Sequence, residues 1–233
     1  MNTLKRILSP CSVDARHWRP SYSQCGEDRI LAFIFRALAI EKPSYLDIGA
    51  HHPHMLNNTF VFYTQGGRGI NIEPDPDLFP AIARARPKDT NLQIGIGSER
   101  GEVPLYVMDV PTLNTFSERE ARKYCQESGH RIKKVVSVQV DTISNAINAY
   151  NGGVFPDLLT LDAEGMDEII LDSIDFTETK PLVICVETLE YTRGGKPQKN
   201  STIAEKLSRH GYFAYADTYI NTIFVLRDRW DER

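Results

Sequence analysis

The stretch "YLDIGAHHPHMLNNTF", residues 45–60, carries the strongest indication of the fold. It begins as a short apolar strand that ends at Gly49, and a strand followed by such a turn is typical of nucleotide-binding α/β proteins. Where further glycines would let a dinucleotide approach the backbone, residues 51–54 are three histidines and a proline. These histidines could bind a metal, transfer a proton or only shape the turn.

Short apolar strands and amphipathic helices alternate outward from this stretch. The pattern predicts strands at 43–49, 68–74, 91–97, 101–108, 135–143, 156–165, 181–188, 213–217 and 221–228, and helices at 27–40, 58–65, 76–86, 166–174 and 203–212. Such alternation predicts an α/β fold in which helices cover both faces of a mostly parallel sheet. The last two strands are separated by a short turn, which indicates an antiparallel C-terminal hairpin at one edge of the sheet.

The composition is that of an ordinary globular protein, with 41% hydrophobic and 25% charged residues and a formal net charge of −4. We expect residues 1–22 to form an arm and residues 23–233 a single domain. No basic stripe points to nucleic acid as a partner. The four cysteines form no CxxC motif, and we find neither a secretion signal nor an apolar run that could span a membrane. A cytoplasmic protein is therefore expected.

Ligands of open α/β sheets bind outside the carboxyl ends of the strands. Glu73 ends the strand that follows Gly49, at about the twenty-residue spacing of an acid that binds the ribose hydroxyls of an adenosine cofactor. Alternatively, Glu73 caps the helix that starts near Pro76. The missing second glycine disfavours a pyrophosphate and hence a dinucleotide. S-adenosylmethionine, which has a ribose but no phosphate, agrees better with this turn.

Several further stretches appear in the order seen in FkbM-type methyltransferases, which the chain resembles over about residues 22–226. They are "YSQCGEDRIL", "YLDIGAHHPHMLNNTFVFYTQGGRGINIEPDPDLF", "VQVDTI", "LLTLDAEGMDEIILDSID", "ICVET" and "NTIFV". The resemblance implies a Rossmann-like class I methyltransferase that uses S-adenosylmethionine and methylates hydroxyl oxygens, commonly of sugars or natural products. The turn "DIGAHHP" departs from the asparagine-rich turn of many members, and we interpret it as a variant of a subgroup.

The resemblance also suggests that "SQCGED", residues 23–28, folds over the cofactor pocket. Asn58 and Thr59 are candidates for holding the methionine end of the cofactor, or they cap the following helix. Ser98 is expected near the adenine. Together with the strand-end residues, the predicted cofactor-binding set is Gln24, Glu27, Asp47, Gly49, Ala50, Asn58, Thr59, Glu73, Ser98 and Asp162.

An alcohol that accepts a methyl group needs its proton removed by a general base or through a metal. The stretch "LLTLDAEG" places Asp162 and Glu164 at the end of a predicted strand. We predict Glu164 as the leading base, although it could instead cap the next helix, and Asp162 as a residue that positions groups or binds metal. Asp162 and Glu187, with Glu164, could form an oxygen-rich Mg²⁺ site.

The histidines after Gly49 do not have the spacing of a zinc site. His51 and His54 are secondary candidates for the base, because an unperturbed imidazole titrates near physiological pH. His52 is expected to shape the turn by hydrogen bonding to backbone.

Two alternative functions stay open at this point, namely an NAD-linked oxidoreductase and a non-catalytic binding module with a vestigial pocket. The expected partner of the methyltransferase is a small-molecule or glycan acceptor. Residues 112–120 could line its pocket, with Ser117 capping a helix and Glu120 completing a capping box. The loop 191–200 is either a lid, in which Arg193 and Lys196 bind an acidic acceptor, or a surface connection.

Overall fold

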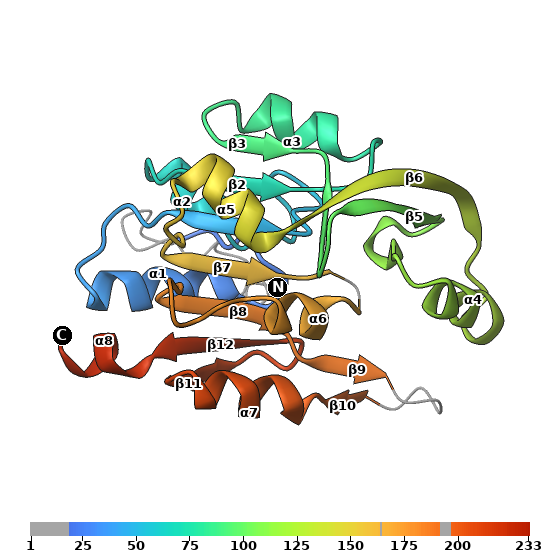
Figure 1. The fold of residues 1–233 in the computed structure, drawn as a ribbon. Coiled ribbons are helices and arrows are strands. Elements are labelled where there is room, and N and C mark those ends of the chain that lie inside the picture. The colour runs from blue at the N-terminus through green and yellow to red at the C-terminus, as the bar shows by residue number, and fades with distance from the viewer. Residues whose placement is uncertain (1–18, 164, 192–196) are drawn as a thin grey trace, which may run out of the picture.

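A computed structural model of the chain describes residues 19–163, 165–191 and 197–233. Across these residues, seven strands form the main sheet in the order β11-β12-β8-β7-β1-β2-β3 (Figure 1). Strands β8, β7, β1, β2 and β3 run parallel, whereas β12 is antiparallel to both neighbours, β8 and β11. The bounds are β1 Tyr45–Ile48, β2 Gly69–Ile72, β3 Thr90–Leu92, β7 Leu158–Leu161, β8 Val183–Glu187, β11 Tyr212–Asp217 and β12 Asn221–Leu226. The predicted Rossmann-like sheet with an antiparallel C-terminal hairpin is confirmed.

Helices cover both faces of this sheet, so every side chain of β1 and of β7 is buried. Successive side chains of a strand point to opposite faces. Leu46 and Ile48 therefore pack in the core layer of α5, α6 and α7, whereas Tyr45 packs in the layer of α1 and α2. The helix bounds are α1 Glu27–Ala37, α2 Phe60–Thr64, α3 Phe79–Ala85, α5 Ile143–Asn151, α6 Asp167–Asp172, α7 Ser201–Arg209 and α8 Arg227–Asp231.

A second sheet, in the order β4-β6-β5, lies with α4 beyond the carboxyl ends of the main sheet. Its elements are β4 Gly95–Gly97, β5 Gly101–Met108, the 3-10 helix η1 Pro111–Leu113, α4 Glu118–Glu127 and β6 Ile132–Thr142. Strand β6 pairs antiparallel with β5 and parallel with β4. In Figure 1, β5, β6 and α4 extend on the side to which the arrows of β7 and β8 point. We refer to residues 101–142 as the insertion.

The single strand predicted at 91–97 is wrong, because the chain leaves the main sheet after β3 and joins the second sheet as β4. Glycines make this crossing possible. A Cβ atom on Gly95 would lie 2.6 Å from Cζ of Phe116, and one on Gly97 would lie 3.0 Å from Cγ1 of Val140. A side chain at either position would require Phe116 or Val140 to shift, so glycine favours the close packing of β4 on the insertion.

Helix α4 begins as predicted at Ser117, whose Oγ accepts from the N–H of Glu120 over 3.2 Å. The second half of the predicted capping box does not form. The N–H of Ser117 donates to Oγ1 of Thr115, and the Glu120 carboxylate pairs with Lys123 and Arg119.

The predicted loop 191–200 contributes to a short antiparallel pair, β9 Leu189–Tyr191 with β10 Pro197–Lys199. Arg193 and Lys196 lie outside the described residues, so a lid here stays a prediction.

The predicted arm, residues 1–22, lies largely outside the described residues, and the domain boundary stays a prediction. Its described end is attached to α1, since Ser21 Oγ, Tyr22 N and Ser23 Oγ all donate to the carboxylate of Asp28. None of the described helices is both long enough and apolar enough to cross a lipid bilayer.

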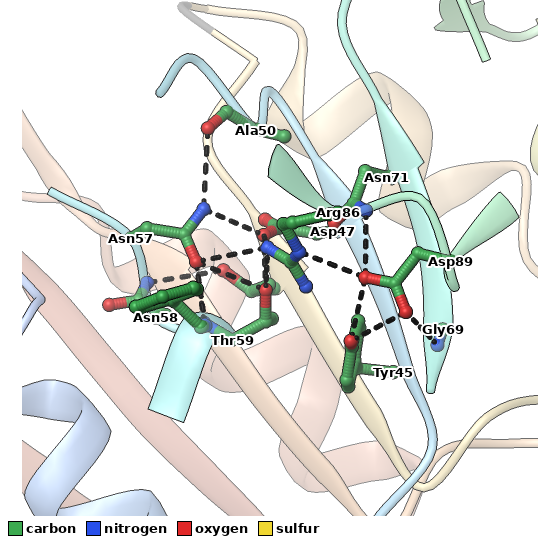
Figure 2. Close-up of polar contacts among 12 residues, drawn as sticks. Tyr45, Asp47, Ala50, Asn57, Asn58, Thr59, Gly69, Asn71, Arg86 and Asp89 are labelled. Carbon is green, nitrogen blue, oxygen red and sulfur yellow. Dashed lines mark hydrogen bonds and ion pairs between the residues drawn. The ribbon is translucent and has the colours of Figure 1, made fainter. Parts of the chain in front are cut away.

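A buried arginine ties the end of α3 to the main sheet (Figure 2). Arg86 is fully buried, and its Nε donates to Oδ2 of Asp89 over 2.8 Å. Its Nη1 donates to Oγ1 of Thr59 (2.9 Å) and Oδ1 of Asn57 (3.3 Å), and lies 3.8 Å from Oδ2 of Asp47. One guanidinium therefore links α3 with β1 and with the start of α2.

Asp89 extends this network to β2 (Figure 2). Its carboxylate accepts from the Tyr45 hydroxyl (2.8 and 2.9 Å), the N–H of Gly69 (3.1 Å) and the side-chain amide of Asn71 (3.0 Å). Among the described residues, Nη2 of Arg86 has no hydrogen-bond partner, but the guanidinium lies 5.1 Å from the ring centroid of Tyr45. Such a cation–π contact contributes to stabilising the buried charge.

Replacing Arg86 by methionine would keep an unbranched side chain but leave Asp47 and Asp89 buried without their cation. We expect the free energy of unfolding to fall by about 3–5 kcal/mol, measured by urea denaturation. Arg209, which is exposed and pairs with Glu205, supplies the control, and Arg209→Met should have little effect. Equal losses in the two variants would contradict a structural role for the buried cation.

Candidate functional site

The carboxyl ends of β1, β2, β7 and β8 open onto a cavity of about 1320 Å³. Six of the residues predicted to act line it, namely Gln24, Gly49, His51, Glu73, Asp162 and Glu187. The insertion supplies a further wall, which includes Leu113, Asn114, Phe116 and Tyr124. The volume exceeds that of most small-ligand pockets, so the cavity has room for a cofactor and an acceptor together.

The turn after β1 joins three strand ends. Gly49 and Ala50 both donate their N–H to the carbonyl of Ile72 at the end of β2, over 3.0 Å each. Gly49 has a φ of +79°, and a Cβ atom on it would lie 1.9 Å from the carbonyl oxygen of Asp162. Glycine is therefore required here, both for its backbone conformation and for the close approach of β7.

Each backbone N–H of residues 49–52 has a partner within the protein. Besides the two bonds to Ile72, His51 donates to Oε2 of Glu73 over 2.8 Å and His52 donates to the carbonyl of Ala50. His51 adopts a left-handed conformation with φ +51°, and its bond to Glu73 stabilises that conformation. Pyrophosphate-binding turns instead present free N–H groups to the ligand. This turn is not built for a diphosphate.

Glu73 follows β2 and lines the cavity, although only 6% of it is exposed. Its Oε2 holds the N–H of His51, and its Oε1 accepts from the N–H of Asp75 over 2.8 Å. Burial raises the pKa of Glu73 to about 7. The cap of the turn before α3 is Asp75, whose Oδ1 accepts from the N–H of Asp77, so Glu73 is not needed for that role.

Asp162 follows β7 and lines the cavity, where the residue is exposed to solvent. Partial desolvation by the protein atoms packed around the carboxyl group, then the carboxylates of Asp167 and Asp47, raise the pKa of Asp162 to about 7. Asp167 holds the turn that follows, because its two carboxylate oxygens accept from the N–H groups of Ala163 (2.9 Å) and Gly165 (3.3 Å). Glu164, the predicted leading base, lies outside the described residues.

The three histidines take different places. His51 lines the cavity, and burial lowers its pKa, so the ring is neutral at physiological pH. The Nδ1 of His52 accepts from the N–H groups of His54 (3.1 Å) and Met55 (2.9 Å), as expected for a residue that shapes the turn. His54 packs on the ring of Phe60 and lines a separate, smaller pocket. The structure thus does not place His54 where it could act as the base.

Residues 47–214 match a family model described as "Methyltransferase FkbM domain". The chain belongs to the FkbM methyltransferase family. The matched range includes the turn after β1, Glu73 and Asp162, and so the larger part of the cavity described above.

Several solved structures are similar to this FkbM domain. An FkbM methyltransferase from Methylobacillus flagellatus is 14% identical with a TM-score of 0.44, over 79% of this chain and 44% of that one. This chain therefore spans less than half the length of that protein. A Burkholderia thailandensis 1,6-didemethyltoxoflavin-N1-methyltransferase is 11% identical with a TM-score of 0.41, over 87% of this chain and 77% of that one. A TehB-like methyltransferase from Corynebacterium glutamicum is 13% identical with a TM-score of 0.42, and 86% of each chain is covered. No curated protein matches the sequence.

Some residues that the sequence assigns to the cofactor lie outside the cavity lining of the FkbM domain. Glu27 is fully buried and accepts from Thr218 Oγ1, Asn221 Nδ2 and the N–H of Cys25, so it anchors α1 to the C-terminal hairpin. Ser98 is exposed after β4.

Four further candidates make contacts within the protein around β1. Asp47 accepts from Thr59 Oγ1 over 2.7 Å and from the side-chain amide of Asn57, and Ala50 is buried. Asn58 donates to Oγ1 of Thr160 on β7. Thr59 occupies the N-cap position of α2 but makes no side-chain cap hydrogen bond; Oδ1 of Asn57 instead accepts from the N–H of Phe60. We therefore interpret Asp47, Ala50, Asn58 and Thr59 as supports of the turn.

The predicted metal ligands Asp162 and Glu187 both line the cavity. In the part of the chain that the structure describes, no group of three or more His, Cys, Asp or Glu side chains is arranged to hold a metal ion. A Mg²⁺ site stays a prediction.

Sequence reasoning missed three side chains that organise the site. Arg86 sits in a stretch that looks like an exposed helix end, and only its neighbours in space show that it is buried. Asp167 is indicated in part by its place before an apolar helix, which is a common position for an acid. Asn114 lies in a loop of the insertion, and nothing in its local sequence indicates that it bonds to Asp75.

Gly49→Ala tests whether the close approach of β1 and β7 matters. Its Cβ atom would collide with the carbonyl of Asp162, so we expect a loss of stability beyond the backbone cost, together with at least about tenfold weaker binding of S-adenosylhomocysteine. Gly129→Ala is the control, because Gly129 also has a positive φ, +72°, but nothing lies within 4 Å of its Cβ position. It should lose only about 1 kcal/mol in thermal unfolding. Similar losses for both variants would contradict the steric argument.

Proposed function

We propose that this FkbM domain transfers the methyl group of S-adenosylmethionine to a hydroxyl oxygen of a small-molecule or glycan acceptor. The observation that carries the proposal is the turn after β1, in which every N–H of residues 49–52 is used and Glu73 faces the cavity. A ligand that presents ribose hydroxyls and no diphosphate agrees with this arrangement. An NAD-linked oxidoreductase would need free N–H groups at the same turn.

The residues of the cavity fit the adenosine part of this cofactor. Each Glu73 oxygen accepts one backbone N–H and keeps a further lone pair, so the ionised carboxylate can accept from two ribose hydroxyls. Gly49 keeps side-chain atoms out of the junction of β1 and β7, and Gln24 supplies an amide from the segment before α1. When bound, S-adenosylmethionine supplies an electrophilic methyl group.

Removal of the hydroxyl proton is assigned to a carboxylate at the end of β7. A general base is most effective when its pKa lies near the working pH. Asp162 faces the cavity and has a pKa raised to about 7, so that it is half ionised near neutrality and can take up the proton as the oxygen–carbon bond forms. Glu164, two residues further along, is the base that the sequence favours, and His51 is the remaining alternative.

The insertion is proposed to hold the acceptor. Its wall combines the side chains of Leu113, Phe116 and Tyr124 with charged residues of α4 that pair with each other, as Lys123 does with Glu120. Such a wall excludes water from one side of the reacting groups while offering polar contacts to a hydroxylated acceptor.

Binding of S-adenosylhomocysteine should depend on pH through Glu73. In the free protein the pKa of Glu73 is raised from 4.5 to about 7, so the folded state holds an extra proton between these values. The resulting stabilisation is complete below about pH 4.5 and is lost as the pH rises through about 7. The ionised carboxylate binds ribose, and affinity should therefore increase by up to about tenfold per pH unit between pH 5 and 7.

Isothermal titration calorimetry with S-adenosylhomocysteine and with NAD measures the affinity of the wild type and of Glu73→Gln at each pH. The variant should bind S-adenosylhomocysteine at least about tenfold more weakly and lose most of the pH dependence. Tight binding of NAD, or an unchanged pH profile in the variant, would contradict the proposal.

Asp162→Asn and Glu164→Gln decide which carboxylate is the base. Loss of the base should lower kcat by about 10²–10⁴-fold, while the Kd for S-adenosylhomocysteine stays within about threefold. Turnover is measured as release of S-adenosylhomocysteine with a panel of saccharides and phenols. The exposed Glu178→Gln serves as the charge-matched control. Cofactor binding without turnover on any acceptor would favour a non-catalytic binding module.

A further inference from the structure

A partly buried hydrogen bond joins the Glu73 turn to the insertion. Asp75 is only 2% exposed, and its Oδ2 accepts from Nδ2 of Asn114 over 2.7 Å. The other side of the Asn114 amide, Oδ1, accepts from the N–H of Met108 at the end of β5 over 2.9 Å. Through the two ends of its amide, Asn114 therefore connects the Glu73 turn with the end of β5 in the insertion. These are two parts of the protein that enclose the cavity.

The same aspartate is in direct contact with the residue proposed to bind ribose. The N–H of Asp75 donates to Oε1 of Glu73 over 2.8 Å, and Oδ1 of Asp75 accepts from the N–H of Asp77. A continuous series of hydrogen bonds thus runs from the N–H of His51 through Glu73 and Asp75 to Asn114. Each step is at or below 2.8 Å, and Glu73 and Asp75 are both buried.

Asn114 is itself part of the wall proposed to hold the acceptor, so a shift of Asn114 would change the shape of that wall. It lines the cavity itself, directly after Leu113 of η1 and shortly before Phe116, which both line the cavity as well. The backbone N–H of the following residue, Thr115, donates to the carbonyl of Tyr106 on β5, and that of Tyr106 donates to the carbonyl of Thr115, so this loop is attached to β5.

We propose that Asp75 and Asn114 are positioning residues that couple cofactor occupancy at Glu73 to the geometry of the acceptor wall. The inference rests on the proposed function, since it takes the Glu73 side of the cavity as the cofactor side. A cofactor that fixes the Glu73 carboxylate fixes the backbone of Asp75, and through Asn114 it orders residues 112–117. Binding at one side thereby prepares the other side, and by linkage the acceptor strengthens cofactor binding to the same degree.

Exchanging the two side chains provides a sharp test. In Asn114→Asp a second carboxylate faces the buried carboxylate of Asp75, so the hydrogen bond is lost and the two like charges repel. In the double variant Asp75→Asn/Asn114→Asp, an amide and a carboxylate face each other again, with Asp77 and Met108 still able to donate their N–H groups. The exchange should therefore restore whatever the single variant loses, as in a double-mutant cycle.

The first measurement is amide hydrogen exchange with and without S-adenosylhomocysteine. In the wild type, saturating ligand should slow exchange at residues 112–117 by at least about threefold; in Asn114→Asp this effect should vanish, and in the exchanged pair it should return. The second is steady-state kinetics with the saccharide or phenol of the panel above that the wild type methylates fastest, for which Asn114→Asp should raise KM by about tenfold or more while kcat at saturation changes little. The exchanged pair should recover the KM.

The control is Lys134→Met. Lys134 and Asp77 form an exposed ion pair between the start of α3 and β6, so the variant removes a surface contact between the same two parts of the protein. It should behave as the wild type in both measurements.

The outcomes separate the two proposals. If S-adenosylhomocysteine binds the wild type without slowing exchange at residues 112–117, the coupling is overturned and the proposed function stands. If the exchanged pair folds and binds ligand but does not recover, the coupling is likewise overturned. If S-adenosylhomocysteine does not bind the wild type, the proposed function is overturned and the coupling falls with it.

Discussion

The buried guanidinium of Arg86 is the interaction on which the site depends. It contacts Asp89 and Thr59 directly and lies near Asp47, so it joins the end of α3 to β1 and to the start of α2. The Asp89 carboxylate in turn accepts hydrogen bonds from Gly69 and Asn71, which joins β2 to the same network. A buried charge with this many partners is costly to disturb, because each partner would lose its counter-charge or donor in a place that water cannot reach.

That network holds the segments on both sides of the turn after β1. Asp47 and Asn57 flank residues 49–52, and each bonds within the network. With its ends held, the turn satisfies its own N–H groups on Ile72 and Glu73 and leaves a carboxylate, not a row of donors, facing the cavity. The ligand that the cavity can bind depends on this carboxylate and on the absence of free N–H groups at residues 49–52. It suits a ribose and disfavours a diphosphate.

The strand-end residues could be found from the sequence because the rule behind them is local. Gly49, Glu73 and Asp162 each follow a recognisable apolar strand, and parallel strands bring their carboxyl ends to one edge. Residues beyond the first turn could not be found in this way. His54, Asn58 and Thr59 lie in an irregular segment without a repeating side-chain direction. Contacts with Phe60, Thr160 and Asp47, respectively, decide where each of these side chains lies. Strand boundaries were also approximate, as at 91–97, where the chain leaves the main sheet after β3 and β4 packs against Phe116 and Val140.

The sequence by itself determined the α/β class, the antiparallel C-terminal hairpin, the FkbM resemblance and the three strand-end residues, since periodicity and strand–turn motifs are properties of neighbouring residues. Only the tertiary structure decided that Arg86 is buried, that Glu27 and Asp47 support the fold and that Asn114 meets Asp75. These contacts join segments far apart in the chain. Their energies come from desolvated charges and paired donors, which no local pattern records.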